Sequence, residues 1–378
     1  MPIQPQRDIS LAQYTTFQLG GRSRYFFEAT SDDEVAQAVA WSTDAKLELY
    51  ILGGGSNLVV ADSGVSGLVL KIATSGISEE DLGYRARIRA SAGVPWDDLV
   101  LYAVDRDLAG IECLSGIPGF VGATPIQNVG AYGQEIAQTL TRVTVLDRTT
   151  MNRLTLTRDQ CRLSYRDSRF KSSEPNRYVV LNVEFELFRV RPRPTRHREL
   201  KARLSAHGLE NPTVQDVRRA VIELRQSKTL VIGATSDPQR SAGSFFVNPV
   251  VDAEVAQALL AREGPAMPVF PEANGKAKLS AAWLIEHAGW KRGTRDGNVG
   301  LSIQHCLVLV AHERAEAQDI VRLAQRIRAA VFERFNVELR PEPSFWGFDD
   351  FDRGLPNLDE DAPPTLGSAS WPTRSANN

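Results

Sequence analysis

The feature that most constrains this chain is a long irregular segment, residues 115–133, with the sequence Ser-Gly-Ile-Pro-Gly-Phe-Val-Gly-Ala-Thr-Pro-Ile-Gln-Asn-Val-Gly-Ala-Tyr-Gly. Its five glycines and two prolines lie between segments with clear helix and strand patterns. Glycine adopts backbone conformations closed to other residues, and proline interrupts helices and central strands. Irregular segments of this length inside a domain are usually functional. The chain must therefore fold as a scaffold that supports a long, shaped loop.

A second glycine-rich turn follows the apolar run Leu49–Leu52, which has the pattern of a buried strand. The turn consists of Gly53, Gly54, Gly55, Ser56 and Asn57. Its backbone N–H groups have the freedom to converge on a phosphate, although a plain glycine-rich turn is an equal alternative. The sequence has no G-x-G-x-x-G and no G-x-x-x-x-G-K-[ST], so a Rossmann nicotinamide site and a P-loop are not indicated.

Two glycine-rich walls suit a dinucleotide, because each can cover one side of a diphosphate cleft. In the 115–133 segment, polar side chains are candidates for donors to the edge of a ring, and isoleucines are candidates to cover its face. The donors are Ser115, Thr124, Gln127 and Asn128, and the isoleucines are Ile117 and Ile126.

Composition excludes several other classes of function. The 44 basic residues nearly balance the 46 acidic ones, so no nucleic acid is expected as a partner. The strongly apolar run 306–310 is far shorter than the roughly 18 residues of a membrane helix, and the polar N-terminus is unlike a signal peptide. The three cysteines are widely spaced and no histidine belongs to an H-E-x-x-H motif, so no disulfide framework and no metal site are predicted.

Local patterns predict a mixed chain of helices and strands. A Ser31-x-x-Glu34 capping box opens a helix near Val35, and an amphipathic helix is expected over 96–108. Thr213-x-x-Asp216 caps a helix that continues to about Lys228. A long helix over about 315–334 has apolar residues at helical spacing, namely Ile320, Leu323, Ile327 and Val331.

A basic run at 189–203 holds seven basic side chains against one acid. A solvated surface linker and a flap that meets a diphosphate are both compatible with this composition. The tail from Gly347 is rich in Asp, Pro, Gly and Ser, which is typical of disorder.

Several motifs, in order and spacing, resemble the UDP-N-acetylenolpyruvoylglucosamine reductase (MurB) family over about residues 14–346. They are Ile51-Leu-Gly-Gly-Gly-Ser-Asn57, the 116–133 run, Tyr165-Arg-Asp-Ser168, Gly243-Ser-Phe-Phe246 and Arg340-Pro-Glu-Pro343. The resemblance implies an α+β fold: an FAD-binding module of the vanillyl-alcohol-oxidase (PCMH-like) type in two subdomains, followed by a C-terminal α/β substrate-binding domain.

The implied organisation has five parts. The FAD-binding domain would span 12–190, with subdomains 12–74 and 75–190. A basic linker and helix at 191–228 would lead to a substrate-binding domain at 229–336. A strand at 337–347, beginning with the strand-like run 337–340, would return the catalytic glutamate, and 348–378 would be a disordered tail.

The resemblance also implies roles for individual residues. Arg166, Ser244 and Glu342 fall where the family keeps its catalytic residues, and Lys228, Asn248 and His197 fall near its substrate contacts. The implied cofactor-binding residues are those of the 53–57 turn with Ser115, Gly116, Ile117, Gly119, Thr124, Gln127 and Gly130. The implied reaction moves a hydride from NADPH through FAD to UDP-N-acetylglucosamine enolpyruvate, giving UDP-N-acetylmuramate. The enzyme is expected to be a monomer in the bacterial cytoplasm.

Considered singly, each catalytic candidate has a structural alternative. Arg166 beside Asp167 fits a surface ion pair, Ser244 fits a turn cap, and Glu342 fits an exposed acid between prolines. An FAD-dependent oxidase of a small alcohol is the alternative enzyme, but such oxidases typically tether flavin through a histidine, and no histidine precedes His197. A catalytically inactive nucleotide-binding protein is the third hypothesis, and the joint presence of Arg166, Ser244 and Glu342 opposes it.

Overall fold

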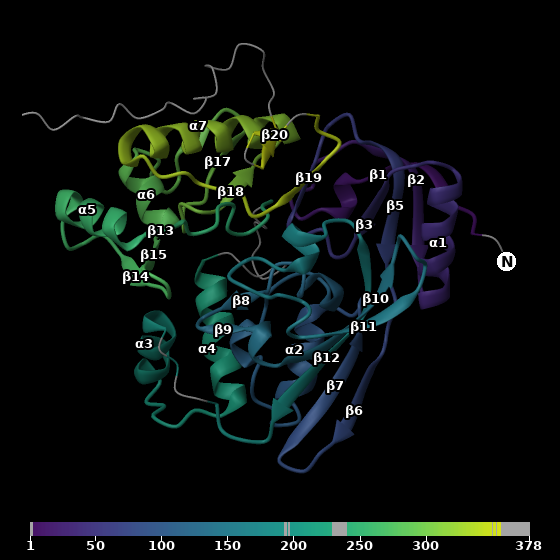
Figure 1. Cartoon of the computed structure of the whole chain (residues 1–378). Coiled ribbons are helices and arrows are strands. Elements are labelled where there is room, and N and C mark those ends of the chain that lie inside the picture. The colour runs from purple at the N-terminus through teal and green to yellow at the C-terminus, as the bar shows by residue number, and fades with distance from the viewer. Residues whose placement is uncertain are drawn as a thin grey trace, which may run out of the picture.

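We analysed a computed structural model of the chain, which describes residues 3–192, 195, 197–228, 240–349, 351, 352 and 354–356. The chain forms three successive parts, each with its own sheet or sheets (Figure 1). Helices and strands alternate irregularly and most sheets are antiparallel, so the predicted α+β class is confirmed.

The first part is a four-stranded mixed sheet with strand order β1-β2-β5-β3, in which β5 pairs in parallel with both β2 and β3. Its elements are β1 (Gln6–Ser10), β2 (Arg22–Ala29), α1 (Asp32–Asp44), β3 (Leu49–Leu52), β4 (Leu58–Val60) and β5 (Val65–Ile72). Ser31 caps α1 as predicted, because its Oγ accepts from the Glu34 N–H at 3.2 Å. The Glu34 carboxylate, however, accepts from Thr30 N–H and not from the cap residue, so the capping box is only half formed.

The second part is a five-stranded antiparallel sheet with strand order β11-β10-β12-β7-β6. Its elements are β6 (Ile77–Asp81), β7 (Arg85–Ser91), α2 (Trp96–Val104), the short pair β8 (Gly130–Ala131) and β9 (Gln134–Glu135), β10 (Leu140–Asp147), β11 (Arg153–Thr157) and β12 (Tyr178–Phe188). Helix α2 ends at Val104, earlier than the predicted 108. Asp107 adopts φ +55°, so the chain turns out of the helix before Leu108.

The segment predicted as a basic linker and one helix, 191–228, contains two helices, α3 (Arg198–Ala206) and α4 (Val214–Ser227). Leu200 and Leu204 of α3 pack with Val221 of α4 and with Cys113. The capping box of Thr213 and Asp216 forms as predicted. Because this cluster includes Cys113, both helices are built onto the second part of the fold.

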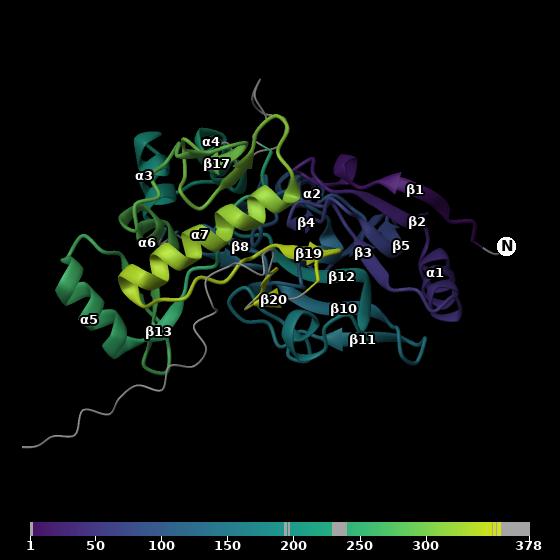
Figure 2. The same ribbon diagram turned by 90° about the horizontal axis from the view of Figure 1, so that it is seen from above.

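The third part surrounds the long helix α7 (Ala317–Phe335), whose Ile320, Leu323, Ile327 and Val331 are fully buried. Its other elements are β13 (Val250–Asp252), α5 (Ala253–Glu263), β14 (Val269–Pro271), β15 (Lys276–Leu279), α6 (Ala281–His287), β16 (Arg295–Asp296), β17 (Val299–Leu301), β18 (Leu309–Ala311), β19 (Ser344–Trp346), β20 (Phe351–Asp352) and β21 (Leu355–Pro356). Figure 2 shows α1 near one end of the molecule and α5 near the other, with α7 lying across the middle.

The third part is attached to the first at two chain crossings. At the first crossing, Thr16 Oγ1 donates to Ser241 O at 2.6 Å, and Arg240 Nε donates to Phe17 O at 3.0 Å. At the second, β19 pairs in parallel with β4, with Ser344 opposite Leu58. The strand expected at 337–340 does not form, because strand pairing begins only at Ser344, where β4 offers a free edge.

Two further contacts hold the third part in place. The Asp62 carboxylate, just after β4, accepts from Ala317 N–H at 2.9 Å and from Gln318 N–H at 3.2 Å, and so caps the N-terminus of α7. On the opposite side, Lys278 Nζ of β15 lies 4.5 Å from the centre of the Tyr165 ring in the second part.

Secondary structure continues past residue 348, where the sequence predicted the start of a disordered tail. Strands β20 and β21 pair with each other, and Leu355 is only 1% exposed. Pro356 O accepts a hydrogen bond from Gln325 Nε2 of α7 at 2.6 Å. This corrects the predicted boundary, because Leu355 supplies an apolar contact to the core around α7. Residues 357–378 lie outside the described residues.

Two truncations test this boundary. A chain ending at residue 356 should keep the turnover and melting temperature of the full chain, because the removed residues are Asp-, Pro- and Ser-rich. A chain ending at residue 347 should be destabilised by about 1.5–3 kcal/mol, the value of burying one leucine side chain. Denaturant unfolding of both chains measures this difference, and equal stability would show that Leu355 contributes nothing.

Within the described ranges, no helix combines the length and the apolar character that a bilayer crossing requires. Among those same residues, no three His, Cys, Asp or Glu side chains gather as a metal ion would need. Cys113, Cys161 and Cys306 are free and buried.

Candidate active site

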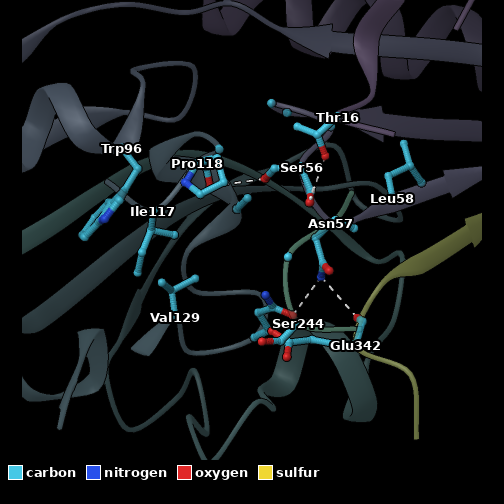
Figure 3. Close-up of a pocket in the computed structure, with 18 of the residues that line it drawn as sticks. Thr16, Ser56, Asn57, Leu58, Trp96, Ile117, Pro118, Val129, Ser244 and Glu342 are labelled. Carbon is cyan, nitrogen blue, oxygen red and sulfur yellow. Dashed lines mark hydrogen bonds between the residues drawn. The ribbon is translucent and has the colours of Figure 1, made fainter. Parts of the chain in front are cut away.

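A cavity of about 830 Å³ lies where the three parts of the fold meet. It is within the range of about 300–1,000 Å³ that is usual for ligand pockets. Both glycine-rich segments line it, together with Arg166, Ser244 and Glu342 (Figure 3). The structure therefore brings the three predicted catalytic residues to the same cavity as most of the predicted cofactor residues.

The 53–57 turn forms the first wall, and its glycines are required by close backbone packing. A Cβ added to Gly54 would lie 2.8 Å from the Cα of Gly119 on the opposite loop. A Cβ added to Gly55, where φ is +61°, would lie 1.8 Å from Tyr14 O. Ser56 Oγ also donates to Pro118 O at 3.2 Å, so the two glycine-rich walls are joined directly.

This wall presents polar groups that suit a phosphate. Within the part of the chain that the structure describes, no hydrogen bond uses the backbone N–H of Gly54, Ser56 or Asn57. Consecutive free N–H groups in a glycine-rich turn make a concave site for an anion. The wall thus fits the diphosphate of a dinucleotide cofactor such as FAD.

The second wall supplies apolar cover next to the first. Ile117, Gly119 and Val129 line the cavity, and Trp96 stands behind Ile117 with its indole N–H donating to Leu114 O at 3.0 Å. Thr124 also lines the cavity, although its hydroxyl donates to Val121 O. A flat ring would find an apolar face here, as the isoleucines in the sequence indicated.

Two predicted cofactor residues do not line the cavity. Ser115 is fully buried and its hydroxyl donates to Glu112 O at 2.7 Å. The N–H of Gly116 donates to Asp97 Oδ1 at 2.6 Å, and Asp97 is in turn paired with Arg218 of α4. These residues fix the start of the loop to α2 and α4.

Arg166 is held in a tight turn with left-handed backbone geometry. Ser164 and Asp167 exchange two backbone hydrogen bonds, and Arg166 between them has φ +54°. A non-glycine residue in this conformation carries strain that is common at functional sites. Its Nη2 donates to Gly130 O at 2.6 Å, and its Nε lies 3.4 Å from Glu342 Oε1.

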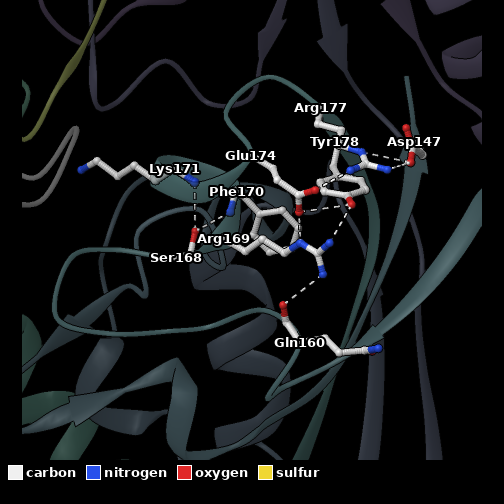
Figure 4. Close-up of polar contacts among 9 residues, drawn as sticks. All are labelled: Asp147, Gln160, Ser168, Arg169, Phe170, Lys171, Glu174, Arg177 and Tyr178. Carbon is white, nitrogen blue, oxygen red and sulfur yellow. Dashed lines mark hydrogen bonds and ion pairs between the residues drawn. The ribbon is translucent and has the colours of Figure 1, made fainter. Parts of the chain in front are cut away.

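A polar network supports the end of this turn (Figure 4). Ser168 accepts hydrogen bonds from Phe170 N–H at 3.1 Å and Lys171 N–H at 3.2 Å, and so caps a five-residue π-helix, Arg169–Ser173. Arg169 then pairs with Glu174.

The network continues through Arg177. This side chain bridges Glu174 and the buried Asp147, with a distance of 2.8 Å from Arg177 Nη2 to Asp147 Oδ2. The turn that carries Arg166 is thereby tied to the strands of the second sheet.

Ser244 and Glu342 are placed side by side by backbone pairing of their two segments. Glu342 N–H donates to Phe245 O at 2.8 Å, and Val247 N–H donates to Arg340 O at 3.0 Å. Phe245 and Phe246 are buried, so the pairing is anchored in the core of the third part. Residues about 100 apart in sequence thus present one hydroxyl and one carboxyl to the cavity.

The surroundings of the Glu342 carboxyl oppose its ionisation. Burial raises the pKa of Glu342, and the opposing effects of Arg166, Lys171 and a hydrogen bond with Gln127 do not cancel this. Asn57 Nδ2 donates to Glu342 O at 3.2 Å and to Gln127 Oε1 at 3.1 Å, and so links the phosphate-binding wall to the acid. A buried carboxyl beside an arginine suits a donor of a hydrogen bond to an anionic group.

The predicted substrate residues divide into two groups. His197 and Lys228 line another part of the cavity together with His305 and Glu199, and Lys228 Nζ lies 2.5 Å from Glu199 Oε2. Burial lowers the pKa of both histidines. Asn248, in contrast, does not line the cavity, because its Oδ1 accepts from Ala281 N–H at the start of α6.

Several lining residues had no signal in the sequence. Thr16, Arg240 and Lys171 reach the cavity only through the packing of distant segments. Lys171 lies near a motif recognised in the sequence, because it follows Ser168 by three residues. That proximity is the sequence feature that could have indicated it.

Comparisons with known proteins agree with this geometry. Residues 23–151 match the family model of the FAD binding domain, and residues 236–346 match that of the UDP-N-acetylenolpyruvoylglucosamine reductase C-terminal domain. The expected FAD-binding module and C-terminal domain are thereby confirmed.

Full-length relatives extend the match. The chain is 43% identical over 351 residues to the UDP-N-acetylenolpyruvoylglucosamine reductase of Thermobifida fusca, which covers 90% of this chain and 98% of the relative. It is 43% identical over 352 residues to UDP-N-acetylenolpyruvoylglucosamine reductase 2 of Corynebacterium glutamicum, covering 91% and 95%. The crystal structure of the reductase (MurB) from Thermus caldophilus shares the fold, with a TM-score of 0.61 at 24% identity over 91% of this chain and 99% of that one.

The 43% identity to the Thermobifida fusca reductase extends over 90% of the chain, and the models of the FAD binding domain and of the reductase C-terminal domain match in that order. The chain therefore belongs to the UDP-N-acetylenolpyruvoylglucosamine reductase family.

Proposed function

We propose that this chain reduces UDP-N-acetylglucosamine enolpyruvate to UDP-N-acetylmuramate, with NADPH as reductant, FAD as cofactor, and Arg166, Ser244 and Glu342 as the catalytic residues. The family to which it belongs comprises flavoprotein oxidoreductases of peptidoglycan precursor synthesis. The observation that supports the assignment of residues is the convergence of a cation, a hydroxyl and a buried carboxyl on the cavity that both glycine-rich walls line.

FAD bound in this cavity would take a hydride from NADPH and supply it to the β-carbon of the enolpyruvyl group. The free N–H groups of Gly54, Ser56 and Asn57 would hold its diphosphate, and Ile117 with Val129 would cover its ring. These assignments follow from the positions of the side chains around the cavity.

Arg166 and Glu342 stabilise the charge that develops on the substrate. Hydride addition at the β-carbon places negative charge on the α-carbon, and this charge spreads into the adjacent carboxylate. The guanidinium of Arg166 offers paired N–H donors, and the protonated carboxyl of Glu342 offers an O–H. Their separation of 3.4 Å lets both act on one group.

Ser244 supplies the proton that completes the reaction. The α-carbon of the enolate is strongly basic, so a weakly acidic hydroxyl suffices as general acid when it is held in place. Pairing of the Ser244 and Glu342 segments holds it there. The new C–H bond takes the proton from Ser244 Oγ, and solvent returns a proton to the oxygen.

Lys228 and His197 are assigned to the diphosphate of the substrate, because they line the same cavity and Lys228 carries a positive charge. We assign the chain to the bacterial cytoplasm as a monomer, with no nucleic acid or membrane partner. The near balance of its charges, 44 basic against 46 acidic residues, supports the first of these absences.

A visible spectrum tests the function. The purified chain should be yellow, and acid precipitation should release all flavin into the supernatant, because no histidine precedes His197 to tether it. Anaerobic NADPH should bleach the colour, and UDP-N-acetylglucosamine enolpyruvate should restore it. Flavin retained in the acid pellet would contradict non-covalent binding, and bleached enzyme that the substrate does not reoxidise would contradict the proposed reaction.

A further inference from the structure

Lys171 is a charged residue of the cavity that the catalytic proposal leaves without a role. It lies in the π-helix that follows the Arg166 turn, and its side chain lines the cavity. Its Nζ makes one hydrogen bond, to Arg166 O at 3.4 Å. Among the described residues, no carboxylate lies within 4.0 Å of this ammonium, so it has no ion-pair partner there.

Lys171 is half-buried, and an ammonium that is removed from water without a counter-ion is costly, since desolvation opposes its charge. Burial lowers the pKa of Lys171, and the nearby Glu342 and Asp167 offset this only in part, while Arg166 acts in the same direction as burial. Asp167 has other partners, because its Oδ1 accepts from Ser168 N–H at 2.8 Å and from Ser172 Oγ at 2.5 Å. The described residues therefore offset the desolvation of Lys171 only in part.

The side chains around Lys171 leave an excess of positive charge that an anionic ligand can neutralise. Arg166 Nε lies 3.4 Å from Glu342 Oε1, and Lys171 lines the same cavity as both residues. The charges of Arg166 and Lys171 both lower the pKa of Glu342. When Glu342 is protonated, Arg166 and Lys171 are two cations that share one cavity with a neutral acid. One anion placed between them would restore the balance and stabilise both cations.

We propose that Lys171 is a second cation for the carboxylate of the substrate, acting with Arg166 to bind that group and to stabilise it as negative charge develops. This inference rests on the proposed function, and it adds a residue from outside the motifs. The hydrogen bond to Arg166 O gives Lys171 a secondary effect, because it fixes the carbonyl of the strained turn.

Three variants separate the charge of Lys171 from its hydrogen bond. Lys171→Gln removes the charge but keeps an N–H donor for Arg166 O, and Lys171→Arg keeps the charge. Lys201→Gln makes the same change at an exposed position of α3 and serves as the matched control. For each FAD-loaded variant we would measure the melting temperature, the Kd of the enolpyruvyl substrate for oxidised enzyme, and the rates of the two half-reactions across pH.

In Lys171→Gln, substrate should bind about 10- to 100-fold more weakly, the range expected for losing a contact to a charged group. Reoxidation of the reduced enzyme by the substrate should slow, whereas reduction by NADPH should stay near the wild-type rate. The melting temperature without substrate should not fall, because the variant removes a buried charge that lacks a partner. Lys171→Arg should keep most of the affinity, and Lys201→Gln should behave as wild type.

The pH profile gives a signature that a merely structural role would not produce. The charge of Lys171 lowers the pKa of Glu342. Because reoxidation requires protonated Glu342, its rate falls as pH rises through that pKa, and removing the Lys171 charge should move this fall to higher pH. The fall should stay in place in Lys171→Arg and in Lys201→Gln.

Four outcomes would overturn the inference. Wild-type substrate affinity in Lys171→Gln would show that only the hydrogen bond matters. Equal slowing of both half-reactions, or a lowered melting temperature with unchanged affinity, would show that Lys171 supports the fold. Loss of affinity in Lys171→Arg as severe as in Lys171→Gln would show that the charge is not the relevant property. If wild-type enzyme itself were not reoxidised by the enolpyruvyl substrate, the proposed function would fail instead, so the two failures are distinguishable.

Discussion

Replacing Ser244 by alanine should slow reoxidation of the reduced enzyme by the enolpyruvyl substrate by at least about 10²-fold, the low end for losing a positioned general acid. Reduction of the flavin by NADPH should remain near the wild-type rate, because that step needs no proton delivered to a substrate carbon. Rapid mixing of oxidised enzyme with NADPH, and of reduced enzyme with substrate, measures the two steps separately.

Ser244→Cys is the matched comparison, since a thiol has nearly the same size and also donates a proton. It should restore part of the lost rate. If alanine slowed both half-reactions equally, Ser244 would be a packing or cofactor-positioning residue, and the proton would come from another group.

Gly55→Ala should destabilise the chain by roughly 2–4 kcal/mol and abolish retention of FAD during purification. The new Cβ would lie 1.8 Å from Tyr14 O, and the backbone at φ +61° disfavours any side chain. The wall would have to separate from the Tyr14 segment, which displaces the free N–H groups assigned to the diphosphate. Denaturant unfolding and the absorbance ratio of flavin to protein measure the two effects.

Gly83→Ala is the control for this prediction. Gly83 also has positive φ, +81°, but a Cβ there would meet nothing within 4 Å. It should show only the conformational cost of about 1–2 kcal/mol and keep its flavin. Equal losses in the two variants would mean that backbone strain, and not the contact with Tyr14, explains the requirement for glycine at 55.

The sequence predicted best those features that depend on neighbouring residues. The capping box of Thr213 and Asp216 fixes the start of α4, since both partners lie within one turn. The apolar spacing of Ile320 through Val331 likewise defines the buried face of α7. That the two glycine-rich segments share one cavity was predicted from their common suitability for a diphosphate and from the family resemblance, because no local pattern brings residue 54 next to residue 119.

The sequence predicted poorly what depends on a distant partner. The strand that follows Glu342 forms at Ser344–Trp346 because the edge of β4 receives it, and nothing near residue 340 reveals that edge. Asn248 was expected at the substrate and instead contacts the start of α6, because its amide oxygen finds the free N–H of Ala281. Ser115 lies at the start of the 115–133 segment, yet its hydroxyl donates to the backbone of Glu112, just before that segment.

The attachments between the first and third parts have a mechanical consequence. Thr16 with Ser241, β4 with β19, and Asp62 with the N-terminus of α7 are three attachments between the same two parts, and three separate attachments resist rotation as well as translation. The contact between Lys278 of the third part and Tyr165 of the second, in comparison, is a single cation over a ring. The position of Glu342 beside the 53–57 turn is therefore set by the first part of the fold, because the β4 edge receives β19 and Asn57 donates to Glu342 O.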